Sequence, residues 1–227
     1  TNLIGRDKEL TSLHKDLIAQ RTSTLAIVAP GGIGKTALAL GLLDRISRDH
    51  HAATWVDGIV YVTLKIDQLT TDGVTQLQSR FSSKLSSRDG MIEELRVAVT
   101  EGLADIFGSD INTFKEAVDT LGTKKLILCI DNLETLIVEH PQAVDDFLEA
   151  IPITWKVIIT SRISINDAKH VPLTELKPKS AEQLARKYLE AKNGPELNET
   201  EITNIVKRCL FNPLSIRLTL DLYILGN

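Results

Sequence analysis

A glycine-rich segment near the N-terminus restricts the possible folds more than any other feature of the chain. It reads Ala-Pro-Gly-Gly-Ile-Gly-Lys-Thr over residues 29–36 and follows the apolar run 25–28. The segment matches the pattern G-x-x-x-x-G-K-[ST], with Ala29 in place of the first glycine. In that pattern the loop lies between a strand and a helix. An ordinary strand–helix turn does not need lysine and threonine after its last glycine. The segment therefore predicts a phosphate-binding P-loop.

Each residue type in this loop has an expected role. The glycines let backbone N–H groups converge on an anion without a Cβ in the way, and the following helix directs its positive dipole end there. Lys35 is expected to reach the β- and γ-phosphates, and the Thr36 hydroxyl to ligate Mg²⁺. The expected nucleotide-binding residues of the loop are Gly31, Gly32, Ile33, Gly34, Lys35, Thr36 and Ala37. The expected cofactors are ATP or ADP with Mg²⁺, since no guanine-reading N-K-x-D motif is present.

Two further apolar runs end in polar residues that fit the same site. Residues 126–130 lead into Asp131, and residues 157–161 lead into Arg162. Parallel strands bring their carboxyl ends to one edge of a sheet. We therefore expect Asp131 to hold Mg²⁺ and Arg162 to contact a γ-phosphate. The alternatives are a strand-end turn at Asp131 and a surface arginine at position 162.

The position directly after Asp131 is occupied by Asn132. Many ATPases with this layout have a glutamate there that activates water. Glu134 is a candidate catalytic residue in its place, or else a solvated residue at a helix start. The absence of an adjacent acid predicts slow or conditional hydrolysis.

Strand-like and helix-like patterns alternate along most of the chain. Strands are expected at residues 25–28, 59–64, 125–130, 156–160 and 170–173, and helices over 6–20, the segment after Lys35, most of 74–122, and 144–151. This alternation predicts an α/β domain over residues 1–176, with a five-stranded, mostly parallel sheet flanked by helices. Residues 177–227 predict a small helical subdomain, which begins with a helix capped by Ser180 and Gln183 and continues with helices over 198–210 and 213–225.

Composition limits the classes of function. The net charge of −4 does not favour a nucleic-acid-binding surface. No apolar run approaches the roughly 20 residues of a membrane-spanning helix. Two cysteines are too few for a disulfide framework, so the expected location is the reducing cytoplasm. Because the sequence begins with Thr1, we expect it to be a piece of a longer protein.

The ordered motifs resemble those of the NB-ARC branch of the STAND ATPases. That branch includes apoptotic-protease activating factors, plant disease-resistance proteins and bacterial signalling regulators. The matching segments are residues 3–10, 31–36, 129–132, 160–162 and 209–214. The last of them resembles the G-L-P-L motif of the family, with Asn212 in place of its glycine. The resemblance covers nearly the whole chain.

The resemblance implies further roles. Residues 3–10, the entry segment, would surround the adenine through backbone contacts. A proline of the helical subdomain would pack on the base or ribose. The residues implied are Ile4, Gly5, Arg6 and Pro213. The segment Thr160–Arg162 would sense the γ-phosphate. By its sequence context alone, Pro213 is only a proline at a helix start.

The leading hypothesis is a nucleotide-dependent switch in signal transduction or defence. ADP would hold the two subdomains closed, and ATP would release them for oligomerisation, with slow Mg²⁺-dependent hydrolysis. Self-association would occur through the full-length protein, and effector and sensor domains would lie outside this fragment. The alternatives are a constitutively active AAA-like ATPase that acts on DNA or in transcription regulation, and a scaffold that binds nucleotide only for stability.

Overall fold

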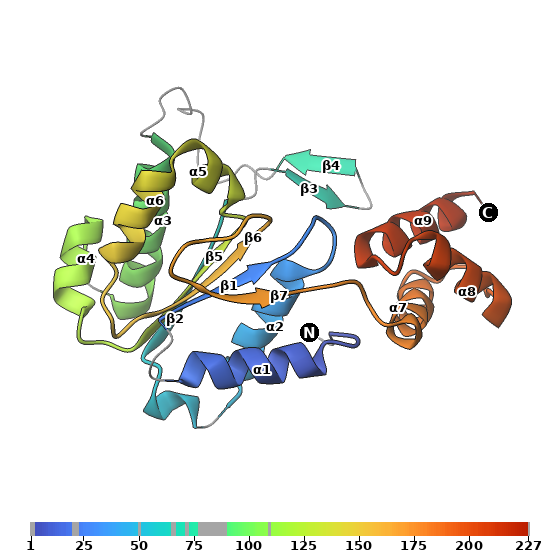
Figure 1. Cartoon of the computed structure of the whole chain (residues 1–227), viewed down its shortest axis with the longest axis horizontal. Coiled ribbons are helices and arrows are strands. Elements are labelled where there is room, and N and C mark those ends of the chain that lie inside the picture. The colour runs from blue at the N-terminus through green and yellow to red at the C-terminus, as the bar shows by residue number, and fades with distance from the viewer. Residues whose placement is uncertain are drawn as a thin grey trace.

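Five parallel strands form the central sheet of the computed structural model, in the order β2–β5–β6–β1–β7 (Figure 1). The strands are β1 Thr24–Val28, β2 Gly58–Thr63, β5 Leu126–Asp131, β6 Lys156–Ser161 and β7 Lys169–Pro172. The structure describes residues 3–19, 23–49, 51–64, 67–70, 73–76, 90–108 and 110–226. The predicted five-stranded parallel sheet is confirmed.

Helices cover both faces of this sheet. One face carries α1 Asp7–Ile18 and α2 Lys35–Ser47, and the other carries α3 Gly90–Phe107, α4 Phe114–Leu121, α5 Glu134–Glu139 and α6 Pro141–Glu149. Successive side chains of a strand point to opposite faces, so Leu128 packs with the second group of helices and Cys129 with the first. Because both faces are covered, every residue of β5 is buried.

The register of the strands brings three carboxyl ends together. Val28 pairs with Ser161 across β1 and β6, and Thr63 pairs with Asp131 across β2 and β5. The loop after β1, Asp131 at the end of β5 and the residue after β6 therefore share one edge. This is where ligands bind in open parallel sheets.

Three helices at the carboxyl end form a separate hydrophobic cluster. They are α7 Pro178–Ala191, α8 Glu199–Arg208 and α9 Pro213–Leu225. Their shared core includes Leu184, Val206 and Ile216, and it also takes in Leu176 from the connection that precedes α7. Figure 1 shows these helices together beyond the end of β7, on the side of the molecule where the loop after β1 lies.

Two predictions about local structure were wrong. Residues 74–76 do not begin a helix but belong to β4 Gly73–Gln76, which pairs antiparallel with β3 Asp67–Thr70; Val74 and Thr75 are β-branched, which favours strand. The rest of that expected helical stretch before Gly90, residues 77–89, lies outside the described residues.

The first helix of the carboxyl-terminal group also begins earlier than predicted. Its first residue is Pro178 and its N-cap is Lys177, which makes no side-chain cap hydrogen bond. The fixed φ of proline suits the first position of a helix, so Ser180 lies within the first turn and does not cap it. Among the described helices, none is long and apolar enough to cross a membrane.

Candidate functional site

The loop after β1 places its glycines where other residues would be strained. Gly32 has φ +79° and Gly34 has φ +102°, both in the left-handed region that glycine tolerates. Gly34 is the N-cap of α2, which begins at Lys35 and has Thr36 and Ala37 in its first turn. The free N–H groups of that turn therefore face the loop, and this arrangement favours an anion.

Lys35 lies folded back over this loop. Its side chain donates hydrogen bonds to the carbonyl oxygens of Ala29 at 2.8 Å and Pro30 at 3.1 Å, and the residue is only 7% exposed. Burial lowers the pKa of Lys35 below its ordinary value, although the charges of Glu134 and Asp131 oppose that shift. An anionic ligand in the loop would offset the cost of burying the ammonium group.

Thr36 and Asp131 meet across the sheet edge. The Thr36 hydroxyl donates to Asp131 Oδ1 at 2.8 Å and lies 3.0 Å from Oδ2. The two residues are 95 positions apart in sequence. The fold thus places together the hydroxyl and the carboxylate that the sequence analysis assigned to Mg²⁺.

Asp131 is 1% exposed, and donors from two strands and a turn surround its carboxylate. Tyr61 donates at 3.2 Å, Asn132 Nδ2 at 2.8 Å, and the Thr160 hydroxyl to Oδ1; Thr63 Oγ1 lies 3.4 Å from Oδ2. A buried carboxylate is costly unless hydrogen bonds satisfy it. Burial, together with the nearby Asp131 charge, raises the pKa of Tyr61, so its hydroxyl remains a donor.

Tyr61 and Thr63 also belong to this site, although their sequence pattern did not predict it. Both lie on β2, which pairs with β5 directly beside Asp131. The sequence signal for them was their position near the carboxyl end of a predicted strand. That signal points to this carboxylate only once the order of the strands is known.

Asn132 has φ +63°, a left-handed conformation that asparagine tolerates. Its backbone N–H donates to Thr160 Oγ1 at 3.0 Å, and its side chain is engaged with Asp131. The residue directly after Asp131 therefore supports the carboxylate and does not point away toward a ligand.

Arg162 and Glu134 form an ion pair beside the loop. Arg162 Nε lies 3.1 Å from Glu134 Oε1, and the side chains are 62% and 17% exposed. Glu134 is the first residue of α5, as the helix-start interpretation expects, but its side chain is mostly buried beside Arg162 and is not solvated. A Cβ built on Gly31 would lie 3.6 Å from the guanidinium carbon of Arg162. Arg162 thus stands next to the P-loop, as expected for a strand-end residue.

The entry segment ties the loop to the connection before α7. Arg6 is 5% exposed, and its Nη2 donates to the carbonyls of Ile33 at 3.1 Å and Thr174 at 2.7 Å. It also pairs with Glu9 at 3.1 Å. These contacts give the Arg6 side chain a structural function, whereas its predicted backbone contact with adenine stays a prediction.

The neighbours of Arg6 in the entry segment contact the helical group. Ile4 packs against the hydrophobic cluster of that group. Gly5 has φ +69°, and a Cβ there would meet the Ser180 side chain at 2.3 Å. The two residues thus lie where the sheet domain and α7 meet, next to the connection held by Arg6.

The start of α9 rests on the P-loop. The Leu214 N–H donates to the Gly32 carbonyl at 3.2 Å, and Asn212 Nδ2 donates to the Gly31 carbonyl at 3.3 Å. A Cβ on Gly32 would lie 2.9 Å from both Asn212 Oδ1 and Leu214 Cβ. Pro213 is the first residue of α9 and is half-buried at this contact. The helical group therefore touches the same loop that carries Lys35.

The residues present fit Mg²⁺ bound together with a phosphate. Within the described part of the chain, no group of three or more histidine, cysteine, aspartate or glutamate side chains could hold a metal. Mg²⁺ commonly uses one or two protein oxygens and completes its shell with water and substrate phosphates. Thr36 and Asp131 supply oxygens of that kind.

Comparisons with known proteins give likenesses in structure only. No family model matches the chain, and no curated protein matches it. A STAND protein with a tetratricopeptide repeat sensor from Pyrococcus horikoshii superimposes with a TM-score of 0.56 at 19% identity, over 96% of this chain and 30% of its own. Domain III of the replication initiation protein DnaA from Thermotoga maritima superimposes with a TM-score of 0.57 at 17% identity, over 94% of this chain and 80% of its own.

The Drosophila ORC bound to DNA gives a TM-score of 0.60 at 13% identity, over 97% of this chain and 54% of its own. The chain thus spans only about a third of the length of the STAND protein it resembles. At these identities the likeness concerns the fold. The chain has the fold of a P-loop ATPase.

Proposed function

We propose that this chain is the nucleotide-binding domain of a cytoplasmic STAND-type signalling protein of the NB-ARC kind. It would bind ADP or ATP with Mg²⁺, and the bound nucleotide would set the position of the helical group and thereby control self-association. The observation that carries the proposal is that the P-loop is contacted from two sides, by residues of the sheet domain and by the helical group. The Thr36–Asp131 pair stands on one side of it, and the start of α9 rests on its Gly31 and Gly32 carbonyls.

The residues on the sheet side would bind the phosphates. Backbone N–H groups of the loop and Lys35 would neutralise the phosphate charge, and Thr36 and Asp131 would hold Mg²⁺. The metal would supply further neutralisation of charge on the β- and γ-phosphates. Arg162, next to Gly31, would add a donor that only the γ-phosphate of ATP can use.

The helical group would respond because its contacts with the loop are weak. Two hydrogen bonds of 3.2 and 3.3 Å join α9 to loop carbonyls, and a typical hydrogen bond contributes only about 1 kcal/mol net. A nucleotide shifts such an arrangement only by binding its two states with different affinity. The Arg162 contact with a γ-phosphate would supply that difference between ATP and ADP.

The test begins with the nucleotide that the purified protein carries, released by denaturation and separated by ion exchange. Wild-type protein and Arg162→Ala are then titrated with ADP, a non-hydrolysable ATP analogue and GDP, each with Mg²⁺. We expect bound ADP, preference for adenine, and a smaller difference between analogue and ADP in the variant, which keeps its ADP affinity.

Arg48→Ala removes another exposed arginine, at the end of α2, and serves as the control. An Arg162→Ala protein that discriminates between the two nucleotides as well as Arg48→Ala does would contradict the proposed role of Arg162. Failure of the wild type to bind any adenine nucleotide would contradict the proposed function itself.

A second candidate function is an AAA-like ATPase that acts on DNA or in transcription regulation. The fold likeness to a replication initiation protein and to a DNA-bound complex favours it, whereas the net charge of −4 does not. Affinity for duplex DNA that falls steeply as salt rises, together with sustained turnover at about 1 s⁻¹ or faster, would support this candidate over the switch.

A further inference from the structure

The ion pair between Glu134 and Arg162 joins two residues that stand next to the P-loop. Glu134 is the first residue of α5, and Arg162 follows the last residue of β6. The ion pair, with 3.1 Å between Nε and Oε1, leaves the guanidinium group beside Gly31. Arg162 is thus bound to Glu134 at the place where it is expected to meet a γ-phosphate.

Glu134 also lies within electrostatic reach of the phosphate-binding lysine. Among the described residues, Glu134 and Asp131 are the carboxylates that act on Lys35, and Glu134 exerts the larger effect. Asp131 is already committed to Thr36, Tyr61 and its other donors. In the part of the chain that the structure describes, Glu134 is therefore the carboxylate near Lys35 that is free to serve a reaction.

Asn132, the residue directly after Asp131, does not supply the base instead of Glu134. Its side-chain amide donates to Asp131 Oδ2 at 2.8 Å, and an amide does not accept a proton at neutral pH. A general base for hydrolysis at this loop must therefore come from elsewhere than the position directly after Asp131.

One oxygen of Glu134 is poised without a partner. Oε1 lies 3.1 Å from Arg162 Nε in the ion pair, whereas Oε2 is buried and has no hydrogen-bond partner among the described residues. Buried polar atoms are normally satisfied, and an exception calls for a functional or solvent explanation. A water molecule held by Oε2 would be positioned by the carboxylate that can deprotonate it.

We infer that Glu134 is the general base for ATP hydrolysis at this loop, that Arg162 restrains it, and that a γ-phosphate releases it by competing for Arg162. The inference rests on the proposed function, because it requires ATP at the P-loop. It would give a chain with Asn132 after Asp131 a route to ATP hydrolysis.

The chemical step is balanced by these residues and water. Glu134 accepts a proton from water as the water oxygen forms a bond to the γ-phosphorus. The bond from that phosphorus to the β–γ bridging oxygen breaks, and its electron pair leaves with ADP. The products are ADP, inorganic phosphate and the proton, which Glu134 returns to solvent. Since ADP has no γ-phosphate to compete for Arg162, the ion pair re-forms.

The effect on affinity should be modest and the effect on hydrolysis large. Partly exposed ion pairs contribute little, so loss of the pair should raise affinity for an ATP analogue relative to ADP by about threefold to fivefold. Loss of a general base typically slows the chemical step by about 10²- to 10⁴-fold.

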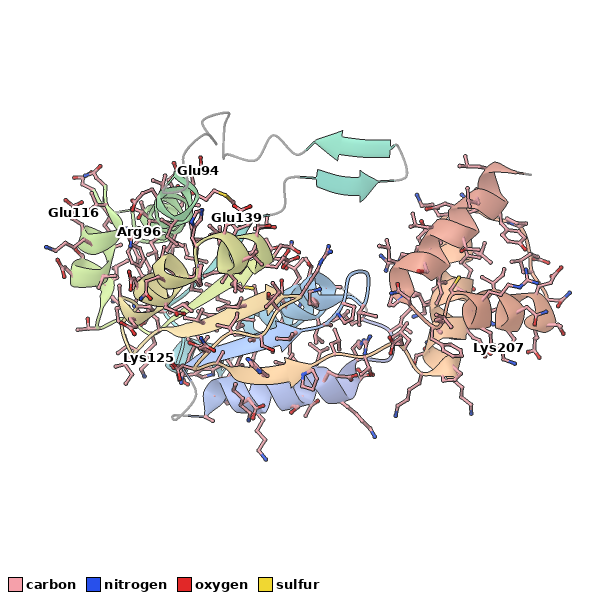
Figure 2. All side chains as sticks on the ribbon, turned by 45° about the horizontal axis from the view of Figure 1, so that its top comes forward. Glu94, Arg96, Glu116, Lys125, Glu139 and Lys207 are labelled. Atoms are coloured by element: carbon pink, nitrogen blue, oxygen red, sulfur yellow. The ribbon has the colours of Figure 1, made fainter. Side chains whose placement is uncertain are left out.

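Glu134→Gln tests the inference, because the amide keeps the volume of the side chain and removes its charge. Affinities for ADP and for a non-hydrolysable ATP analogue are measured by calorimetry with Mg²⁺, and hydrolysis by single turnover. The analogue-to-ADP preference should rise about threefold to fivefold, and hydrolysis should fall at least about 100-fold. Glu139→Gln is the matched control, since Glu139 is exposed at the other end of α5 (Figure 2).

An unchanged or lower preference for the analogue in Glu134→Gln would contradict the proposed restraint of Glu134 by Arg162. Unchanged hydrolysis in this variant would contradict the role of Glu134 as the general base. If Glu134→Gln unfolds, Arg162→Gln breaks the pair from its other side. That variant should remove the preference for the analogue and retain measurable hydrolysis, and its loss of all hydrolysis would contradict the inference. Failure of wild-type protein to bind adenine nucleotide would instead refute the proposed function, a result distinct from all of these.

Discussion

The two sides of the P-loop differ in how firmly they are built. On the sheet side, Asp131 is 1% exposed and accepts hydrogen bonds from Thr36, Tyr61, Asn132 and Thr160. On the helical side, two hydrogen bonds of 3.2 and 3.3 Å hold the start of α9 to loop carbonyls. The sheet side is therefore held rigidly, whereas the helical side can rearrange at a small cost in free energy.

This difference follows from the way each region is held in the chain. Asp131 is fixed by pairing of β5 with strands on both sides. The α7–α9 group has its own hydrophobic cluster and reaches the sheet through the connection around Leu176. That connection is held by the Leu176 N–H to the Phe211 carbonyl and by Arg6 to Thr174. A region with its own core can move as a unit without exposing it.

Asp131→Ala should break the sheet side most severely. The change leaves several buried donors without their acceptor, and each such group costs about 1–3 kcal/mol. We expect a loss of about 3 kcal/mol in the free energy of unfolding, measured by urea denaturation. Asp119→Ala, at an exposed position on α4, should change it far less. Equal effects of the two variants would show that the donors around Asp131 find other partners.

Lys35→Ala should separate ligand binding from stability on the same side. The loss of charge-assisted hydrogen bonds to phosphate, worth about 1.5–3 kcal/mol, should weaken ADP binding roughly tenfold to 100-fold, measured by calorimetry. Burial lowers the pKa of Lys35, so the folded state binds this proton less tightly than the unfolded chain. At neutral pH, protonation of Lys35 therefore favours unfolding.

Removal of Lys35 should accordingly leave the free energy of unfolding unchanged or slightly higher. A Lys35→Ala protein that loses ADP binding only because it is unfolded would contradict this. Circular dichroism in the absence of nucleotide distinguishes the two cases.

Asn212→Asp should produce the smallest effect on the free energy of unfolding. It tests most directly how the helical side of the P-loop is held. Asn212 Oδ1 caps α9 by accepting from Leu214 and Ser215, while Nδ2 donates to the Gly31 carbonyl. Aspartate keeps the cap but turns the donor into an oxygen. We expect a change of less than about 0.5 kcal/mol in unfolding, and faster hydrogen exchange where α9 meets the loop.

Asn198→Asp is the matched control, because Asn198 caps α8 in a capping box away from the loop. It should leave exchange at the loop and at the start of α9 unchanged. If both variants behave alike, the Asn212 contact with Gly31 does not hold the helical group.

Local sequence patterns predicted most of the fold because they report burial directly. The apolar run 126–130 became β5, in which every residue is buried. The helix expected after Lys35 became α2, whose buried face includes Leu38, Leu42 and Ile46. Prediction failed where burial gave no pattern. The start of α7 was placed too late because it depends on Pro178. Residues 74–76 were expected to be helical but pair antiparallel with β3.

The sequence by itself determined the chemistry available at the loop: glycines at left-handed positions, then Lys35 and Thr36 at the start of a helix. Only the tertiary structure decided which distant groups meet it. The order of the strands brings Tyr61 to Asp131, and the start of α5 lies beside the end of β6, where Glu134 meets Arg162. The physical reason is that a local motif specifies backbone geometry within one turn, whereas contacts between strand ends depend on how the whole sheet packs.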